Sequence, residues 1–380
     1  MLVAGEASGD LLGGALIEAL RRHYPGARYS GVGGERMTEA GLDAWWDRRE
    51  LSVMGLFEVL SHLPRLLRLR RALRARILAA APDAVIGIDA PDFNLGLERS
   101  LKAAGLRTVH YVSPTVWAWR TGRAAKIGRA VDLLLCLFPF EPEFYDGHGV
   151  RARYTGHPLA DAIPLESDRA VARERLGLER DGTCVALLPG SRRSEVERLT
   201  TPLLDAAERL AGRRAGLTFL AALADENTAA PFRAELERRP ELACRVFTGR
   251  ALEVMEASDA VALASGTATL ECMLVNRPMA VIYRLSPMTY HAARMLKMFK
   301  SEHFALPNIL AGERLVPELL QEDVNGEAIA DALEAWLNDP GAVERLSGRF
   351  RALHRELRCD AAASAADAIR ELLDETQGAA

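Results

Sequence analysis

Two turns of small residues in the second half of the chain have the composition of a diphosphate-binding site. One lies at residues 188–192 and the other at residues 264–271, and each follows an apolar run and precedes a helical pattern. Such a turn leaves unpaired backbone N–H groups at a helix N-terminus, where they can hold a phosphate. Arg192 can pair with a diphosphate through two N–H groups at once. The second turn supplies the candidate contacts Ser265, Gly266 and Thr267.

Glu271 lies one turn into the helix that follows the second of these turns. A carboxylate there can accept hydrogen bonds from both hydroxyls of a ribose attached to the same phosphates. The alternative is an acidic residue that only benefits from the positive end of the helix dipole. Together with Arg192 and the Ser-Gly-Thr turn, Glu271 favours a nucleoside-diphosphate site.

Asp89 is the candidate for proton transfer in the first half of the chain. It directly follows the apolar run 84–88, so it stands at a strand end, where catalytic side chains of parallel sheets lie. A carboxylate in that place could accept the proton of a substrate hydroxyl. The alternative is a carboxylate that ties down its own loop.

Two further strand ends could contribute to the wall of the same cleft. The turn at residues 5–10 carries Glu6 and Ser8, but it has neither a G-x-G-x-x-G pattern nor a lysine followed by serine or threonine. Its alternative is a tight turn in which Ser8 caps the next helix. Trp117 and Arg120 follow the run 108–112 and could face a sugar or a phosphate, or the aromatic rings could pack on a neighbouring helix.

Residues 53–80 form a basic segment with a regular apolar pattern. From residue 59 to residue 82 there is no acidic residue, whereas six arginines occur. On a helical wheel five apolar residues share one arc, namely Leu63, Leu66, Leu69, Leu73 and Ile77. A basic amphipathic helix after an apolar approach is typical of a membrane-surface element, although an ordinary helix that covers a sheet has the same pattern. The residues expected to face the membrane are Val53, Met54, Leu56, Phe57, Leu63, Leu66, Leu69, Arg65, Arg68 and Arg71.

Composition argues against several classes of function. The net charge of −4 argues against general nucleic-acid binding, and the five dispersed cysteines lack the spacing of a zinc site or a disulfide framework. An odd, dispersed set of thiols is typical of a cytosolic protein. No Asp-x-Asp pair or histidine cluster indicates a metal site. The longest apolar run, residues 133–140, is too short to span a bilayer, so membrane contact is expected to be peripheral.

The candidate residues stand on an alternation of apolar runs and helical patterns, which predicts α/β architecture with parallel sheets covered on both faces. At 380 residues two domains are expected. One series of predicted strands lies at residues 2–4, 29–32, 84–88, 108–112, 133–137 and 152–154. A second series lies at residues 184–188, 217–221, 244–247, 260–263 and 279–283. The predicted domains are residues 1–160 and 161–345, followed by helices at 346–380 that pack back on the first domain.

Both series place their candidate residues at the carboxyl ends of strands, where open α/β sheets bind ligands. Two such domains are expected to face each other across a cleft, with a linker near residues 156–166. Only four residues precede Gly5, so the first strand is expected either to begin upstream of this sequence or to be short.

Several strings in this chain match, in the same order, strings of lipid-A-disaccharide synthases. They are residues 5–10 (GEASGD), 53–55 (VMG), 87–94 (GIDAPDFN), 110–114 (HYVSP), 116–120 (VWAWR), 188–192 (LPGSR), 265–268 (SGTA), 306–308 (LPN) and 310–312 (LAG). The chain therefore resembles that family from residue 2 to about residue 359. The resemblance implies the GT-B architecture, which has two Rossmann-like domains, and an inverting glycosyl transfer.

The resemblance also implies a specific reaction. UDP-2,3-diacylglucosamine donates its sugar to the 6-hydroxyl of 2,3-diacylglucosamine 1-phosphate (lipid X), which gives a β-1,6-linked disaccharide 1-phosphate and UDP. It implies Asp89 as the base, Arg192 and Glu271 as UDP contacts, residues 265–267 at the diphosphate and Asn308 near the cleft. It further implies that residues 53–76 dock from the cytoplasm on the anionic inner surface of the bacterial inner membrane. No cofactor is expected, since the UDP-sugar is a substrate. The resemblance does not decide whether the chain forms a homodimer.

Two other functions are compatible with the residues alone. One is another GT-B enzyme, either a transferase that uses UDP-N-acetylglucosamine or a UDP-sugar epimerase. The other is a peripheral membrane protein that binds a nucleotide without catalysis, although Asp89 in its loop argues against it. A dehydrogenase is disfavoured because the dinucleotide fingerprint is missing.

Overall fold

The computed structural model describes residues 1–51, 56–114, 124–286, 290 and 302–377, and for residues 56–63 and 376–377 it describes the backbone alone. The chain divides into two compact units. The first consists of residues 1–161 with 357–380, and the second of residues 162–356.

The first unit is built on a seven-stranded parallel sheet with the strand order β3-β2-β1-β4-β5-β6-β7. Its strands are β1 (Leu2–Ala4), β2 (Tyr29–Gly33), β3 (Leu42–Asp47), β4 (Val85–Ile88), β5 (Thr108–Tyr111), β6 (Leu133–Cys136) and β7 (Ala152–Tyr154). Its helices are α1 (Ala7–His23), α2 (Glu35–Glu39), η1 (Arg48–Glu50), α3 (Leu56–Ala80), α4 (Pro91–Lys102), α6 (Ala124–Gly128), α7 (Glu141–Tyr145), α8 (Pro158–Ala162) and α18 (Ala361–Gln377). Because β2 and β3 lie on one side of β1 and β4 to β7 on the other, the order of the strands reverses between β1 and β4.

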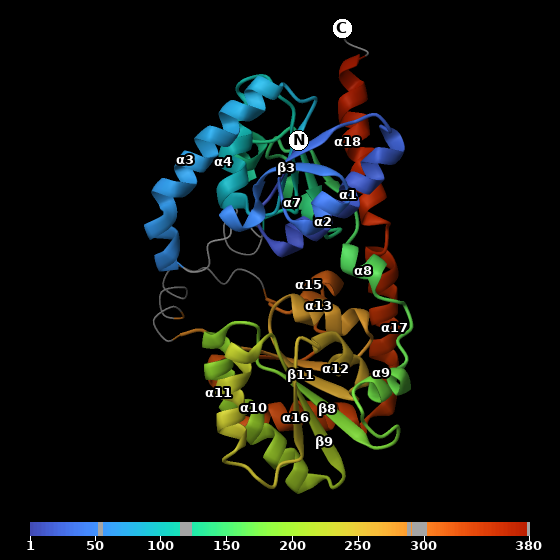
Figure 1. The fold of residues 1–380 in the computed structure, drawn as a ribbon. Coiled ribbons are helices and arrows are strands. Elements are labelled where there is room, and N and C mark those ends of the chain that lie inside the picture. The colour runs from blue at the N-terminus through green and yellow to red at the C-terminus, as the bar shows by residue number, and fades with distance from the viewer. Residues whose placement is uncertain (52–55, 115–123, 287–289, 291–301, 378–380) are drawn as a thin grey trace. The chain divides into compact units, whose positions relative to one another are not determined.

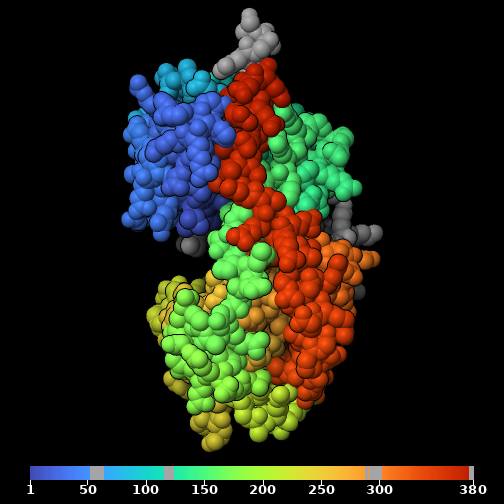
Figure 2. All heavy atoms as spheres, turned by 90° about the vertical axis from the view of Figure 1, so that its right-hand side faces the viewer, coloured from blue at the N-terminus to red at the C-terminus, as the bar shows by residue number. Residues whose placement is uncertain are grey.

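Helices cover both faces of the first sheet (Figure 1), and alternate residues of its strand β1 belong to two separate cores. Leu2 and Ala4 belong to a core shared with α1 and α18, and Figure 2 shows α18, in red, running along the blue N-terminal helices. Val3, between them, belongs to the core on the other face, together with Leu73 and Ile77 of α3. Successive side chains of a strand point to opposite faces, so a strand covered on both faces must be apolar throughout. Each large aliphatic side chain buried in this way contributes roughly 1.5–3 kcal/mol.

The second unit is built on a six-stranded parallel sheet with the order β10-β9-β8-β11-β12-β13. Its strands are β8 (Thr183–Leu188), β9 (Leu217–Leu223), β10 (Cys244–Thr248), β11 (Ala260–Ala264), β12 (Met279–Tyr283) and β13 (Glu318–Leu320). Its helices are α9 (Arg169–Arg175), α10 (Arg193–Arg213), α11 (Glu226–Leu236), α12 (Ala251–Ala257), α13 (Thr267–Leu274), α15 (Leu306–Ala311), η3 (Gln321–Asp323), α16 (Gly326–Asn338) and α17 (Pro340–Leu357). Here the strand order reverses between β8 and β11. Helices α10 and α16 pack with the apolar face that carries Leu187 and Phe219.

The structure confirms two Rossmann-like halves with parallel sheets, and the predicted strands are present with ends displaced by at most two residues. The sequence did not predict β3 and β13, which are edge strands. Strand β3 carries Asp43 and Asp47 on its exposed side, and β13 has only 3 residues and begins with Glu318. Edge strands are often short and charged, which removes the apolar pattern that identifies a strand.

Candidate functional site

The two strands that flank the reversal of the first sheet bring the first group of candidates together. Ala4 at the end of β1 pairs with Ile88 at the end of β4. Gly5 and Asp89 follow directly, and a Cβ atom on Gly5 would lie 3.1 Å from the Cβ of Ala90. The turns after β1 and β4 are therefore in contact, at the kind of place where open α/β sheets bind ligands.

Asp89 is held at this edge in a strained backbone conformation. Its φ is 54° and that of Ala90 is 44°, in the left-handed region that residues other than glycine seldom adopt. One carboxylate oxygen, Oδ1, accepts the N–H of Ala90 at 2.8 Å and ties down the turn, as the alternative interpretation expected. The other, Oδ2, accepts a longer contact of 3.4 Å from the hydroxyl of Ser8. Because the side chain is only half-buried, it is also accessible to a ligand at the strand ends.

The turn after β1 differs from the alternative interpretation of its sequence. Helix α1 begins at Ala7 with Glu6 as its N-cap, so the alternative in which Ser8 caps this helix is wrong. Ser8 is exposed in the first turn, where its hydroxyl donates to Asp89, and Glu6 is exposed as well. Asp10 is buried and caps the start of α2 by accepting N–H groups of the backbone there. This motif therefore combines two exposed polar residues, Glu6 and Ser8, with one buried structural carboxylate, Asp10.

Part of the predicted wall and of the predicted membrane surface cannot be placed. Trp117, Arg120, Val53 and Met54 lie outside the described residues. For three further residues only the helical backbone is described, namely Leu56, Phe57 and Leu63.

Helix α3 divides into two parts along its length. In its second half Leu73 and Ile77 are completely buried in a cluster with residues of α4 and of the sheet. That half covers the sheet, as the alternative interpretation of the basic segment expected. In residues 64–71 of α3, which lie before Leu73 and whose side chains are described, Leu66 and Leu69 are half-buried. The predicted basic residues that are exposed there are Arg65, Arg68 and Arg71.

The two small-residue turns of the second half meet in one pocket. They follow β8 and β11, which are neighbours and flank the reversal of the second sheet. The pocket has a volume of about 240 Å³. Its lining includes Gly190, Ser191, Glu195, Ser265, Gly266, Thr267, Ala268 and Glu271. Turns that are far apart in the sequence thus form one concave wall.

Arg192 is the N-cap of α10, and its side chain is 80% exposed. Its backbone N–H donates to Glu195 Oε2 at 3.3 Å, and its guanidinium donates to Oε1 at 3.4 Å. We did not predict Glu195, although a glutamate three residues after the cap is the sign of a capping box. Gly190 makes room for this carboxylate, since its φ is 115° and a Cβ there would lie 2.5 Å from Glu195 Oε2.

Both donors of Ser265 are used within the protein. Its N–H donates to the carbonyl of Ile282 at 2.9 Å, and its hydroxyl donates to the carbonyl of Phe304 at 3.0 Å. Gly266 and Thr267 are exposed at the start of α13, whose first N–H groups have no acceptor within the helix. Gly266 and Thr267 are therefore the part of the turn that suits a phosphate, and the hydrogen bonds of Ser265 hold that turn in place.

Glu271 lines the same pocket from the second turn of α13. Burial raises the pKa of its carboxyl above the ordinary value for glutamate. Hydroxyl donors from a ligand would offset the cost of holding a charge there. The position thus suits a ribose attached to phosphates at the start of the helix.

Asn308 does not match the expectation that it lies near a cleft surface. Its side chain is completely buried. The amide oxygen accepts the N–H groups of Leu315 and Val316 at 2.8 and 2.9 Å, and the amide nitrogen donates to the carbonyl of Val316 at 3.0 Å. Asn308 therefore fixes the segment that leads into β13 instead of facing a ligand.

Three further features concern metal ligands, membrane-spanning helices and cysteines. In the part of the chain that the structure describes, no group of three or more His, Cys, Asp or Glu side chains is arranged to hold a metal ion. In that same part, no helix combines the length and the apolar character needed to cross a membrane. The five cysteines, all within it, are free thiols.

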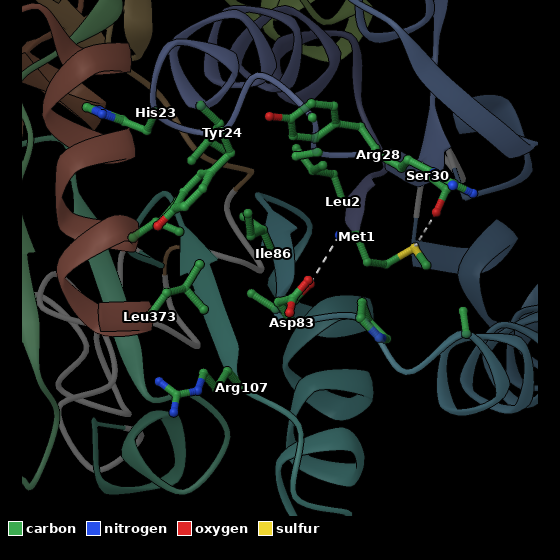
Figure 3. A pocket seen from close by; sticks show the side chains of 18 of the residues that line it. Met1, Leu2, His23, Tyr24, Arg28, Ser30, Asp83, Ile86, Arg107 and Leu373 are labelled. Carbon is green, nitrogen blue, oxygen red and sulfur yellow. Dashed lines mark hydrogen bonds between the residues drawn. The ribbon is translucent and has the colours of Figure 1, made fainter. Parts of the chain in front are cut away.

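Another cavity lies at the opposite edge of the first sheet (Figure 3). It has a volume of about 1140 Å³, and its lining residues begin or precede β1, β2, β4 and β5 or belong to neighbouring helices. The amino group of Met1 donates there to the carbonyl of Ala84 at 3.1 Å. Because open parallel sheets bind ligands at the carboxyl ends of their strands, this cavity is separate from the candidate site.

The comparisons with known proteins agree with the motifs. A family model described as lipid-A-disaccharide synthetase matches residues 1–369. A lipid-A-disaccharide synthase of Xanthomonas campestris is 52% identical over 378 residues, which are 99% of this chain and 86% of that protein. One of Xylella fastidiosa is 50% identical over 376 residues, which are 98% of each chain.

Solved structures agree on the fold. A UDP-GlcNAc 2-epimerase from Neisseria meningitidis, bound to UDP-GlcNAc, has a TM-score of 0.64 at 12% identity and covers 98% of this chain and 99% of its own. The glycosyltransferase of kitacinnamycin has a TM-score of 0.60 at 17% identity, with 98% of each chain covered. At such low identity these neighbours show the GT-B-like architecture alone.

Proposed function

The chain belongs to the lipid-A-disaccharide synthase family, and with that membership as premise we propose how its residues carry out the reaction. It is a glycosyltransferase of lipid A disaccharide synthesis, a role that uses a nucleotide-sugar and an acceptor of the lipid X type. The proposed donor is UDP-2,3-diacylglucosamine and the proposed acceptor is 2,3-diacylglucosamine 1-phosphate. The proposed products are the β-1,6-linked disaccharide 1-phosphate and UDP.

The convergence of two turns in one pocket of the second unit is the observation that carries the proposal. UDP binds there, with its diphosphate at the N–H groups of Gly266 and Thr267 and beside the guanidinium of Arg192. Arg192 exchanges its contact with Glu195 for the phosphate, since the existing contact is long and exposed. Glu271 accepts the ribose hydroxyls.

Asp89 of the first unit acts as the base. The 6-hydroxyl oxygen of the acceptor forms a bond to C1 of the donor sugar as the bond from C1 to the β-phosphate oxygen breaks. Asp89 accepts the hydroxyl proton, and the electron pair of the broken bond leaves on UDP. A single displacement inverts the configuration at C1, so one carboxylate suffices. The half-buried carboxylate at the reversal of the first sheet supports this assignment.

The charge that develops on UDP is stabilised by groups of the protein. Arg192 supplies a full positive charge, and the start of α13 supplies aligned N–H groups that need no rearrangement during the reaction. We therefore propose that the enzyme uses neither a metal ion nor a cofactor, and that the UDP-sugar acts as a substrate only.

Residues 64–71 of α3 support a peripheral contact with the anionic inner face of the bacterial inner membrane, from the cytoplasmic side. Arg68 and Arg71 are exposed, and Leu66 and Leu69 are half-buried beside them. Arg65 is exposed too but forms an ion pair with Glu50, which reduces its contribution. Basic side chains above an apolar strip attract anionic lipid head groups and let the strip enter the interface.

Product formation from UDP-2,3-diacylglucosamine and lipid X tests the proposed function. The wild-type chain should form the disaccharide and release UDP, whereas UDP-N-acetylglucosamine should be a poor donor. Asp89→Asn should lose turnover, because the amide cannot accept the proton. Asp92→Asn is the matched control, since Asp92 is an exposed carboxylate in the first turn of α4, and it should retain turnover. Equal use of both donors, or full turnover by Asp89→Asn, would contradict the proposal.

A further inference from the structure

A cluster of polar side chains is buried directly beneath the Asp89 turn, within an otherwise apolar core. It consists of Asn94 and Glu98 on α4 and His110 on β5, which are 0%, 1% and 0% exposed. Glu98 Oε1 lies 2.8 Å from His110 Nδ1. None of these three side chains reaches the surface, so none of them can touch a substrate. Their number and burial nevertheless require an explanation, because buried polar groups are costly unless they are hydrogen-bonded.

Asn94 joins the ends of the two strands that carry the first part of the site. Its side-chain nitrogen lies 2.8 Å from the carbonyl oxygen of Asp89, 3.2 Å from that of Val3 and 3.3 Å from that of Ile88, so one of its two N–H groups is shared between two carbonyls. Val3 belongs to β1 and Ile88 to β4, the strands on either side of the reversal. One amide group thus fixes the end of β4 against β1 and holds the peptide that follows Asp89.

The Asp89 turn needs such a restraint. Two consecutive residues, Asp89 and Ala90, have φ values of 54° and 44°. Neither is glycine, so this conformation is unfavourable by itself and persists only where the surroundings impose it. The bond from the Ala90 N–H to the Asp89 carboxylate depends on this conformation and aims the carboxylate.

Gly87 connects the restraint to the Glu98–His110 pair. A Cβ atom at Gly87 would lie 2.1 Å from Glu98 Oε1 and 3.0 Å from the Cβ of Asn94. The absent side chain therefore leaves the space that Glu98 and Asn94 occupy together. Gly87 also pairs with His110 in the sheet, so the bond between Glu98 of α4 and His110 of β5 lies beside Gly87, two residues before Asp89.

This cluster is not optimised for stability alone. Within the described residues, Asn94 Oδ1, Glu98 Oε2 and His110 Nε2 are buried and form no hydrogen bond with another protein atom. Burying three polar side chains together costs free energy that well-packed apolar side chains of similar volume would not cost, so stability alone does not account for the cluster.

We propose that Asn94, braced by the Glu98–His110 pair, is a positioning residue that holds the Asp89 carboxylate where it meets the acceptor hydroxyl. This inference rests on the proposed role of Asp89 as the base. A general base must lie within hydrogen-bond reach of its proton, and a misplacement of about 1 Å can cost roughly 100-fold in rate. Donor binding belongs to the other unit and does not depend on this restraint.

Asn94→Leu is the principal test, because leucine keeps the volume of the side chain and removes its donors. We expect kcat to fall about 100-fold, while the KM for the UDP-sugar and the affinity for UDP stay at the wild-type value. Glu98→Leu should show the same pattern in weaker form. Glu98→Gln retains a partner for His110 Nδ1 and should restore most of the turnover lost in Glu98→Leu. This split between kcat and KM, with rescue by glutamine, is not expected of side chains that only stabilise the fold.

Thr108→Val is the matched control. Thr108 is completely buried in the same unit and its hydroxyl donates to the carbonyl of Ala130 at 3.1 Å, but it lies at the start of β5, away from Asp89. This variant should lower the thermal midpoint and leave kcat unchanged. If Asn94→Leu does not fold, Gly87→Ala decides, because the added methyl group displaces Asn94 and Glu98 without altering either. A folded Gly87→Ala variant should lose turnover and keep its affinity for UDP.

The outcomes separate this inference from the proposed function. Full turnover by Asp89→Asn would refute the role of Asp89 as base and, with it, the inference. If Asp89→Asn is inactive while the variants of Asn94 and Gly87 behave like Thr108→Val, the inference alone is overturned. If turnover is lost but UDP affinity falls in parallel, the cluster is a general structural element and the positioning role is refuted.

Discussion

The reversal of the first sheet, between β1 and β4, and that of the second sheet, between β8 and β11, carry different kinds of site. At the first, one carboxylate stands on a strained turn, and a buried amide holds that turn from below. At the second, residues at the starts of α10 and α13 line a pocket of about 240 Å³, and the exposed Arg192 is the N-cap of α10. The same position in two similar sheets thus offers one fixed side chain in one case and mainly backbone groups in the other.

The difference follows from what each proposed ligand requires. A proton is transferred to one oxygen at one place, so its acceptor must be held firmly. A diphosphate spreads its charge over several oxygens, and N–H groups with one mobile arginine can satisfy it in more than one arrangement. Changes at the first site should therefore reduce kcat, and changes at the second should weaken donor binding.

The largest effect is expected for Asp89→Asn. Turnover should fall by about 10²–10⁴-fold, the range that general base catalysis contributes. The affinity for UDP, measured by calorimetry, should remain at the wild-type value because the proposed nucleotide contacts lie in the second unit. Weakened UDP binding in this variant would contradict the assignment of proton transfer and donor binding to separate sites.

Arg192→Ala should produce the opposite pattern. Loss of a charge-assisted contact to the diphosphate should raise the KM for the donor and weaken UDP binding by about 10–100-fold. Arg193→Ala is the control, because Arg193 is the adjacent exposed arginine and its side chain donates to Glu197 at 2.8 Å. Equal effects of the two substitutions would indicate a general charge effect and not a contact of Arg192 with UDP.

A double change, Leu66→Ser with Leu69→Ser, should weaken sedimentation with anionic phospholipid vesicles about tenfold, because it removes apolar surface from the exposed half of α3. Leu73 is excluded from this test because it is completely buried and its replacement would unfold the unit. Leu11→Ser changes a leucine that is 58% exposed on α1 and should leave vesicle binding unchanged. Vesicle binding by the double variant equal to that of the wild type would exclude α3 as the membrane contact.

Glu271→Gln should have a smaller effect that depends on pH. Burial raises the pKa of Glu271 in the folded protein, so the group favours folding at low pH and this contribution is lost as the pH rises through the raised pKa. The glutamine variant should therefore be more stable than the wild type at neutral pH, and the gain should disappear as the pH falls toward the ordinary value for glutamate. UDP affinity should be several-fold weaker in the variant at neutral pH. The thermal midpoints of the variant and the wild type, measured from pH 4 to 8, should differ at neutral pH and converge as the pH falls. A difference that stays constant over this range would contradict the prediction.

The smallest expected effect is that of EDTA. If Arg192 and the start of α13 stabilise the leaving UDP, chelation of divalent ions should leave turnover unchanged. A large loss of activity that magnesium restores would show that the second site is incomplete without a cation.

Much of the fold could be predicted from local patterns. Buried parallel strands such as β4 and β11 are short apolar runs that end in small or polar residues, and this pattern needs no knowledge of the rest of the chain. The edge strands β3 and β13 escaped prediction because exposed strands lack that pattern. The apolar arc of α3 could also be predicted from the sequence. The sequence did not show that Leu73 is buried against the sheet whereas Leu66 is only half-buried.

The site divides in the same way. Asp89 and the turn at residues 265–267 could be found because each directly follows an apolar run, and Arg192 because it stands in the small-residue turn after another such run. Glu195 could have been found as the partner of a helix cap. Asn308 could not be assigned correctly, because an asparagine that binds a ligand and one that holds a loop look alike until its neighbours are known.

The sequence by itself determined which residues stand at strand ends and to which family the chain is similar, because both depend on residues that are close together in the chain. Only the tertiary structure decided which strand ends are neighbours. The pairing of β8 with β11 joins the two turns of the proposed nucleotide pocket, and the pairing of β1 with β4 brings Ser8 and Asp89 together above Asn94. Which distant strands become neighbours depends on how whole sheets and helices pack around a core, and a short stretch of sequence does not specify it.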